Sequence, residues 1–182
     1  MGKIYEYLTP ELHAWLAMQR MFFVATAPLA SRGFVNCSPK GTDSFRVLGP
    51  REVAYHDLTG SGIETVAHLK ENGRIVLMFC SFDAAPKIVR LHGEGSVVER
   101  DDPRHPELAA RFPAHAGSRS IIVVNVSRIS DSCGYGVPLF HFVRERDTLT
   151  RHCEQKGPEG LAAYRAQKNR TSLDGLPGLR GF

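Results

Sequence analysis

The fold is decided by residues 52–80, which read EVAYHDLTGSGIETVAHLKENGRIVLMFC. An apolar segment of β-prone residues at 52–58 opens this stretch, and a second one, at 74–82, begins within it and runs just past its end. Between them lie a glycine-rich loop at 59–62 and a segment with helical spacing from Ile63 to Asn72. The pair Asn72-Gly73 is a helix stop signal. The stretch therefore predicts a strand, a loop, a helix and a second strand in succession.

Similar strand patterns continue on both sides of this unit and give at least seven strands in all. Gly, Pro and Asp turn signals separate them. Most joins are too short for a crossover helix, so the pairing should be mainly antiparallel. A further helix is expected only at 104–112. Many strands of similar length predict a mainly β fold, a closed or nearly closed β-barrel with flanking helices. The other strands are expected at 21–27, 34–38, 44–48, 87–99 and 120–130.

The two ends of the chain have a different character from the barrel. Near the start, Thr9 can cap a helix with Pro10 at its first position, and this helix should end near Arg20. After the last strand the sequence is helical again, with a break at Gly157-Pro158. We therefore divide the chain into a barrel domain at 1–131 and a C-terminal helical arm and tail at 132–182. The arm is expected to lie over the barrel or over a partner subunit.

Composition excludes several classes of protein. The 182 residues carry a net charge of +4 without a Lys/Arg cluster, which favours a small anionic ligand over nucleic acid. No apolar run reaches the ~20 residues of a membrane helix, and the N-terminus lacks the pattern of a secretory signal. The default location is the cytoplasm, where Cys37 and Cys80 are expected as buried thiols. Neither the cysteines nor the histidines have a metal-ligand spacing, so no metal is predicted.

The glycine-rich loop is a candidate anion site. Free backbone N–H groups at the start of a helix favour negative charge, and Thr59, Ser61 and Thr65 add hydroxyl donors. The loop has neither the Walker pattern nor the dinucleotide fingerprint. Glu64 would repel an anion, and it can instead complement the helix N-terminus. A simple capped turn explains the same residues, so both interpretations stay open.

Two further motifs could contact a ligand. The segment NCSPKG, residues 36–41, places Lys40 just after a strand, where it can pair with a phosphate or simply face solvent. In PKIVRLHGEG, Arg90 and His92 share one face of a strand, which indicates either a ligand-bearing face or the barrel exterior. No Gly-x-Ser-x-Gly elbow occurs, which argues against a hydrolase.

Taken in order, these features resemble the pyridoxamine 5'-phosphate oxidase-related family of FMN-binding split barrels. The resemblance runs from about Leu8 to Ser130. It rests on the motifs FFVATA, FVNCSPKG, VAYHDLTG, GSGIETVAHLKENGR, VLMF and VRLHGEG. It implies an antiparallel Greek-key split barrel and a homodimer, with FMN as the cofactor in a groove at the dimer interface.

The resemblance also implies roles for individual residues. Lys40 would be the first phosphate contact, and Ser61, Gly62 and Thr65 would add further ones. Asn36, Cys37 and Ser38 would run along the isoalloxazine edge. The residues from Tyr55 to Asp57 would flank the ribityl chain, and Arg90 would lie near the flavin at the dimer interface. The catalytic residues are unknown; His92, Arg90 and Cys37 are the possibilities. The implied cofactor-binding residues are Asn36, Cys37, Ser38, Lys40, Tyr55, His56, Asp57, Ser61, Gly62, Thr65 and Arg90.

The sequence departs from the true oxidases at two places. Those enzymes carry Ser-Arg-Lys where this chain has Ile63-Glu64-Thr65, so two phosphate-pairing cations are missing, and Arg46 or Arg90 would have to compensate. The tail also lacks the Arg- and Trp-bearing segment that holds pyridoxal phosphate. We therefore expect an FMN-dependent oxidoreductase with a substrate other than vitamin B6. The alternatives are a non-catalytic flavin carrier or sensor, and a relative that uses a deazaflavin or haem.

Overall fold

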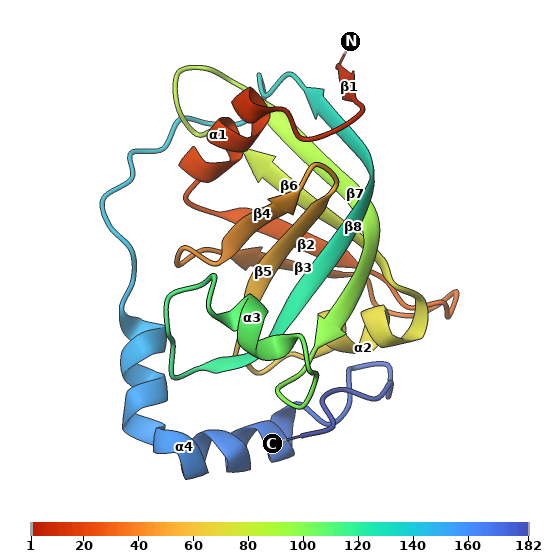
Figure 1. Ribbon diagram of the computed structural model, residues 1–182, viewed down its shortest axis with the longest axis vertical. Coiled ribbons are helices and arrows are strands. Elements are labelled where there is room, and N and C mark those ends of the chain that lie inside the picture. The colour runs from red at the N-terminus through yellow and green to blue at the C-terminus, as the bar shows by residue number, and fades with distance from the viewer. Residues whose placement is uncertain (1, 182) are drawn as a thin grey trace.

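The structure, a computed structural model, describes residues 2–181 and contains eight strands and four helices (Figure 1). All strand pairings are antiparallel. The elements are, in chain order, β1 (Ile4–Tyr5), α1 (Pro10–Met18), β2 (Phe22–Thr26), β3 (Asn36–Lys40), β4 (Phe45–Gly49), β5 (Glu52–Leu58), α2 (Glu64–Asn72), β6 (Arg74–Cys80), β7 (Ile88–Val98), α3 (His105–Ala109), β8 (Ser118–Ser132) and α4 (Thr148–Lys168).

The strands form one curled sheet in the order β3-β2-β6-β7-β8-β5-β4, and β1 pairs with the far end of β8. The two edge strands, β3 and β4, do not pair with each other, so the barrel is open between them. Side chains nevertheless meet across the interior. The ring of Phe45 on β4 lies 5.6 Å from Phe22 on β2 and 4.9 Å from Phe79 on β6. The predicted antiparallel split barrel is confirmed, and its walls do not close.

Alternation along the strands separates an inner core from an outer cluster. The inner face carries the main core, with Leu77, Leu91 and Ile122 fully buried. On the outer face, Ile121 packs with Phe112 beside α3. Helix α1 lies at one end of the barrel, and α2 and α4 lie at the other end (Figure 1). Both ends of the core are therefore covered by helices.

The helix boundaries follow the signals in the sequence. Thr9 Oγ1 accepts a hydrogen bond of 3.2 Å from the amide of Leu12, which confirms the predicted cap of α1. Helix α2 stops at Gly73, whose φ of 72° is in the left-handed region that favours glycine. Cys80 is buried as predicted. The prediction for Cys37 was wrong: it is exposed, because it lies on the outward side of β3, an edge strand along which burial alternates.

The chain beyond β8 forms an arm and a tail. Residues 133–147 have no regular structure and lead along one side of the barrel to α4 (Figure 1). The expected break in α4 is present at Gly157, which has a φ of 64° and precedes Pro158. The tail then folds back on α4, where the amide of Leu179 donates to the carbonyl of Asn169. None of the helices in residues 2–181 combines the length and the apolar character needed to cross a membrane.

Candidate functional site

Edge strand β3 turns three polar side chains toward the interior of the barrel. Asn36, Ser38 and Lys40 are half-buried, whereas Cys37 and Pro39 between them are exposed. The three inward residues pair with inward-facing, buried residues of β2. Polar groups therefore line the open edge of the core, where an ordinary barrel strand would place apolar side chains.

These side chains reach partners on β5 and α2. Lys40 Nζ lies 3.4 Å from Asp57 Oδ1 and 5.8 Å from the ring centroid of Tyr55. Asn36 Nδ2 donates to Thr65 Oγ1 at 2.9 Å. The contacts join β3, β5 and α2 across the opening of the barrel. We call this set the seam cluster; its members are Asn36, Ser38, Lys40, Tyr55, Asp57 and Thr65.

Two hydroxyl groups of the seam cluster are buried without a hydrogen-bond partner among residues 2–181. They are Ser38 Oγ and Tyr55 OH. Burial, and then the charge of Asp57, raise the pKa of Tyr55 well above its ordinary value, so the phenol stays neutral. Thr65 acts on this pKa in the opposite sense, although no hydrogen bond of ordinary geometry joins the two groups. Unpaired buried hydroxyls are costly, which marks this place as one that a ligand or water would satisfy.

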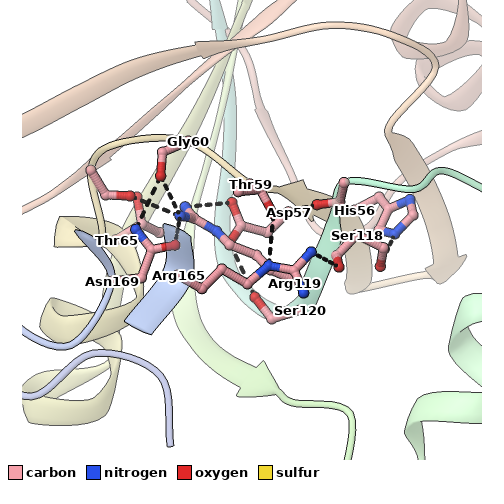
Figure 2. Close-up of polar contacts among 12 residues, drawn as sticks. His56, Asp57, Thr59, Gly60, Thr65, Ser118, Arg119, Ser120, Arg165 and Asn169 are labelled. Atoms are coloured by element: carbon pink, nitrogen blue, oxygen red, sulfur yellow. Dashed lines mark hydrogen bonds and ion pairs between the residues drawn. The ribbon is translucent and has the colours of Figure 1, made fainter. Parts of the chain in front are cut away.

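Asp57 is the anchor of the cluster. Its carboxylate is fully buried and accepts from Arg119 Nε at 2.6 Å and from Ser120 Oγ at 3.1 Å (Figure 2). Burial alone would raise the pKa of Asp57, but Arg119 and Lys40 outweigh it and lower the pKa to about 2. The positive charges of Arg119 and Lys40 therefore keep the Asp57 carboxylate ionised. The predicted contact of Asp57 with the ribityl chain of FMN stays a prediction.

The glycine-rich loop is fastened by its carbonyl oxygens. Arg119 Nη1 donates to the carbonyl of Gly62 at 2.9 Å, and Asn169 Nδ2 donates to the carbonyl of Gly60 at 3.0 Å (Figure 2). Within residues 2–181, no acceptor engages the backbone N–H of Gly60, Ser61 or Gly62. The loop therefore keeps its amide groups available while its carbonyls face a buried arginine.

Glu64 supplies the negative charge next to this loop. A Cβ built on Gly62 would collide with the Glu64 carboxylate, so the carboxylate lies directly against the loop. Its Oε1 also accepts from the amide of Leu173 in the tail at 3.4 Å. The interpretation of Glu64 as a complement to the helix N-terminus agrees with this position. The phosphate contacts of Ser61 and Gly62 stay a prediction, and a phosphate there would meet this carboxylate.

The C-terminal helix contributes residues that sequence reasoning missed. Arg165 Nε donates to Thr59 Oγ1 at 2.9 Å, and Thr59 Oγ1 donates to the carbonyl of Gly117 at 2.8 Å. One signal was available, because Arg165 and Asn169 stand four residues apart and share one face of a helix. A second was Arg119, a charged residue at the start of an apolar strand. Neither signal reveals that these side chains meet the loop.

The remaining predicted residues lie apart from the seam cluster. Besides Cys37, His56 points to the outer face, where its Nε2 lies 2.6 Å from Ser118 Oγ. Burial, and then the neighbouring His115, lower the pKa of His56. Arg90 is in register with outward-facing residues and donates from Nη1 to Ser132 Oγ at 3.0 Å. A single chain therefore does not bring Cys37, His56 and Arg90 together with Lys40.

A buried histidine connects the seam cluster with the tail. Asn36 Nδ2 donates to Thr26 Oγ1 at 3.1 Å, and Thr26 Oγ1 lies 3.0 Å from His68 Nδ1. On the other side of the ring, His68 Nε2 lies 3.7 Å from Asp174 Oδ2. A chain of side-chain contacts through Thr26 and His68 therefore connects Asn36 on β3 with Asp174 in the tail. Across residues 2–181, no group of three or more His, Cys, Asp and Glu side chains is arranged to hold a metal ion.

Comparison with known proteins identifies the family. Residues 8–133 match the sequence profile described as pyridoxamine 5'-phosphate oxidase. The chain belongs to the pyridoxamine 5'-phosphate oxidase family. A similar member of this family is the pyridoxamine 5'-phosphate oxidase family protein ustO of Aspergillus flavus, 43% identical over 192 residues, which cover 96% of this chain and 77% of that protein.

Several solved structures share the fold of this protein, although their sequences are only distantly similar to it. A point variant of HupZ from Group A Streptococcus aligns with a TM-score of 0.53 and 20% identity, over 69% of this chain and 99% of that one. A FAD-binding protein from Mesorhizobium loti aligns with a TM-score of 0.50 and 11% identity, over 72% of this chain and 96% of that one. At these identities the likeness establishes the split-barrel fold alone.

Proposed function

We propose that the protein binds FMN at the seam cluster and uses it for an oxidation–reduction reaction, as a cytoplasmic homodimer. The observation that carries the proposal is the position of Lys40 beside two buried hydroxyls, Ser38 and Tyr55, that have no partner within residues 2–181. Membership of the pyridoxamine 5'-phosphate oxidase family and the FAD-binding relative from Mesorhizobium loti support a flavin as the ligand. Four free thiols are compatible with a reducing compartment.

The donor set suits the phosphate and ribityl part of a flavin nucleotide. Lys40 would pair with the phosphate as a point charge, with part of its own charge offset by Asp57. Ser38 and the neutral phenol of Tyr55 would donate hydrogen bonds to oxygen atoms of the ligand, while Asn36, whose two amide donors are taken by Thr26 and Thr65, would hold β3 in place. The flavin would supply the hydride chemistry, and the protein would bind it, orient it and exclude water.

A second copy of the chain would complete the site. The seam cluster includes three residues of β3, which is an edge strand of the sheet, so a second chain could cover the cluster there. The arm at 133–147 exposes several large apolar side chains, which is unusual for a surface that faces water. Their exposure supports the homodimer, because a partner subunit would cover them. They are Tyr135, Leu139, Phe140, Phe142 and Val143.

The absorbance spectrum of the purified protein tests the proposal most directly. We expect the absorbance bands of a flavin in the purified protein, or flavin that stays with the protein after colourless protein is mixed with FMN and the free FMN is removed. Light scattering should give the mass of a dimer. A protein that neither carries nor acquires FMN would refute the proposal, and a monomer that retains FMN would refute its dimeric part.

Turnover separates an enzyme from a carrier. Steady consumption of NAD(P)H with an electron acceptor is the expected result for an oxidoreductase. Tight FMN binding without any turnover would instead support the flavin carrier or sensor, because the fold does not fix the function. A spectrum typical of a deazaflavin or of haem would identify a relative with another cofactor.

A further inference from the structure

A second polar pocket lies where α4 crosses the end of β7 and the start of β8. Its volume is about 180 Å³, and it includes no residue of the seam cluster. This volume has room for a phosphate-sized ion. The lining residues are Glu99, Arg100, Asp101, Arg119, Arg165 and Gly181.

Two arginines of this pocket converge on one backbone oxygen. The Nη2 atoms of Arg100 and of Arg165 each lie 2.8 Å from the carbonyl oxygen of Ser118. Arg100 is exposed at the rim, whereas Arg165 is 5% exposed and lies deeper. Two guanidinium groups that share one acceptor repel each other. An anion bound to both groups would offset this repulsion.

The carboxylates around this pocket offset the positive charge of the two arginines only in part. Arg119 is paired with Asp57, and Glu99 is paired with Lys70 at 2.6 Å. These pairs leave Arg100 and Arg165 against Asp101, which is exposed at the rim. Neither of the two arginines forms an ion pair with a carboxylate within the described range 2–181.

The buried member, Arg165, also has donors to spare. Its Nε and Nη2 are hydrogen-bonded to Thr59 and Ser118, whereas its Nη1 makes no hydrogen bond within residues 2–181. Burial, and then the charges of Arg100 and Arg119, lower the pKa of Arg165. A buried cation without a counter-ion is strongly destabilising, so an anion at this place would relieve a real cost.

We propose that this pocket is a binding site for a phosphate-sized oxyanion, held by the guanidinium groups of Arg100 and Arg165. Planar guanidinium groups match the oxygen geometry of phosphate and sulfate. The site is separate from the seam cluster and binds its ion whether or not a flavin is present. Because Arg165 also donates to Thr59, the bound ion fixes α4 against the first residue of the glycine-rich loop.

Isothermal titration of the full chain with inorganic phosphate tests the proposal, with ionic strength held constant by sodium chloride. The variants are Arg100→Gln, which changes an exposed rim residue, and Arg165→Gln, which changes the buried one. The matched control is Arg151→Gln, also on α4, whose exposed side chain pairs with Asp147 at 3.0 Å. Loss of a guanidinium partner should weaken phosphate binding by about tenfold or more, and the control should bind as the wild type does.

The following results decide between the outcomes. Circular dichroism establishes that each variant is folded, and if Arg165→Gln is not, Arg100→Gln alone carries the test. Unchanged phosphate binding in a folded Arg100→Gln protein would overturn the proposal, as would an equal loss in the control. Lys40→Ala should leave phosphate binding intact. Protein saturated with FMN should still bind inorganic phosphate, and loss of that binding would overturn the separation of the two sites.

Discussion

Replacement of Asp57 by Asn tests whether the buried ion pair is the anchor of the site. The carboxylate is 0% exposed, the side chain of Arg119 is 5% exposed, and their closest atoms are 2.6 Å apart. Without the carboxylate, Arg119 would stay buried with only neutral partners, which typically costs about 3–5 kcal/mol. At about 2–4 °C per kcal/mol for a chain of this size, the melting temperature should fall by roughly 6–20 °C.

The same variant should change the dependence of stability on acid. The folded pKa of Asp57 lies at about 2, below its ordinary value of 3.8. A carboxyl with a lowered pKa stabilises the fold when it is ionised in both states, and this contribution is lost as the pH falls from about 4 to about 2. The difference of nearly two pKa units corresponds to roughly 2 kcal/mol. Asp57→Asn should lack this part of the acid transition.

Urea unfolding at pH 7 and pH 3 measures both effects. Asp102 provides the control. Arg104 lowers the pKa of Asp102 to about 2 as well, but this ion pair lies at the surface, where the side chain of Asp102 is 21% exposed and that of Arg104 is 55% exposed. A surface pair contributes below about 1 kcal/mol, so Asp102→Asn should be nearly neutral. If Asp57→Asn costs no more than Asp102→Asn at pH 7, the reasoning from burial is wrong.

Three other substitutions have outcomes that the structure predicts. Lys40→Ala should weaken FMN binding by about 1–3 kcal/mol, or roughly 5–150-fold, in a fluorescence titration; an unchanged affinity would place the phosphate elsewhere. Gly178→Ala should lower the stability by about 1–3 kcal/mol in urea unfolding, because the new methyl group would collide with the carbonyl of Asn169, whereas Gly181→Ala meets nothing within 4 Å and should be neutral. Thr9→Ala should cost about 1 kcal/mol through loss of the helix cap, and a thermal melt identical to that of the wild type would contradict this.

Local signals in the sequence predicted much of the fold. The cap at Thr9, the stop at Gly73 and the break at Gly157 each depend on neighbouring residues, so they could be predicted without knowledge of the tertiary structure. The exposure of Cys37 depends instead on where β3 lies in the sheet. An alternating strand has the same pattern at an edge as in the middle of a half-covered sheet, and only the strand order distinguishes the two.

The candidate site was harder to predict because its parts come from distant segments. Lys40 and Tyr55 were assigned to it through the family resemblance, and they do lie close together. Arg119 and Arg165 were missed, since nothing near them in sequence shows that they meet the loop at 59–62. The pairing of Lys40 with Asp57 was likewise invisible, because the polarity of a strand residue does not reveal the charge that faces it.

The fastening of the loop by α4 has a consequence for the order of folding. Arg165 lies 106 residues after Thr59, and Asn169 lies 109 residues after Gly60. Contacts of such sequence separation form late, because the entropy of closing the intervening chain must first be overcome. During synthesis the barrel strands can pair before α4 emerges from the ribosome. A nascent chain that already has a complete sheet would thus still carry an unfastened loop.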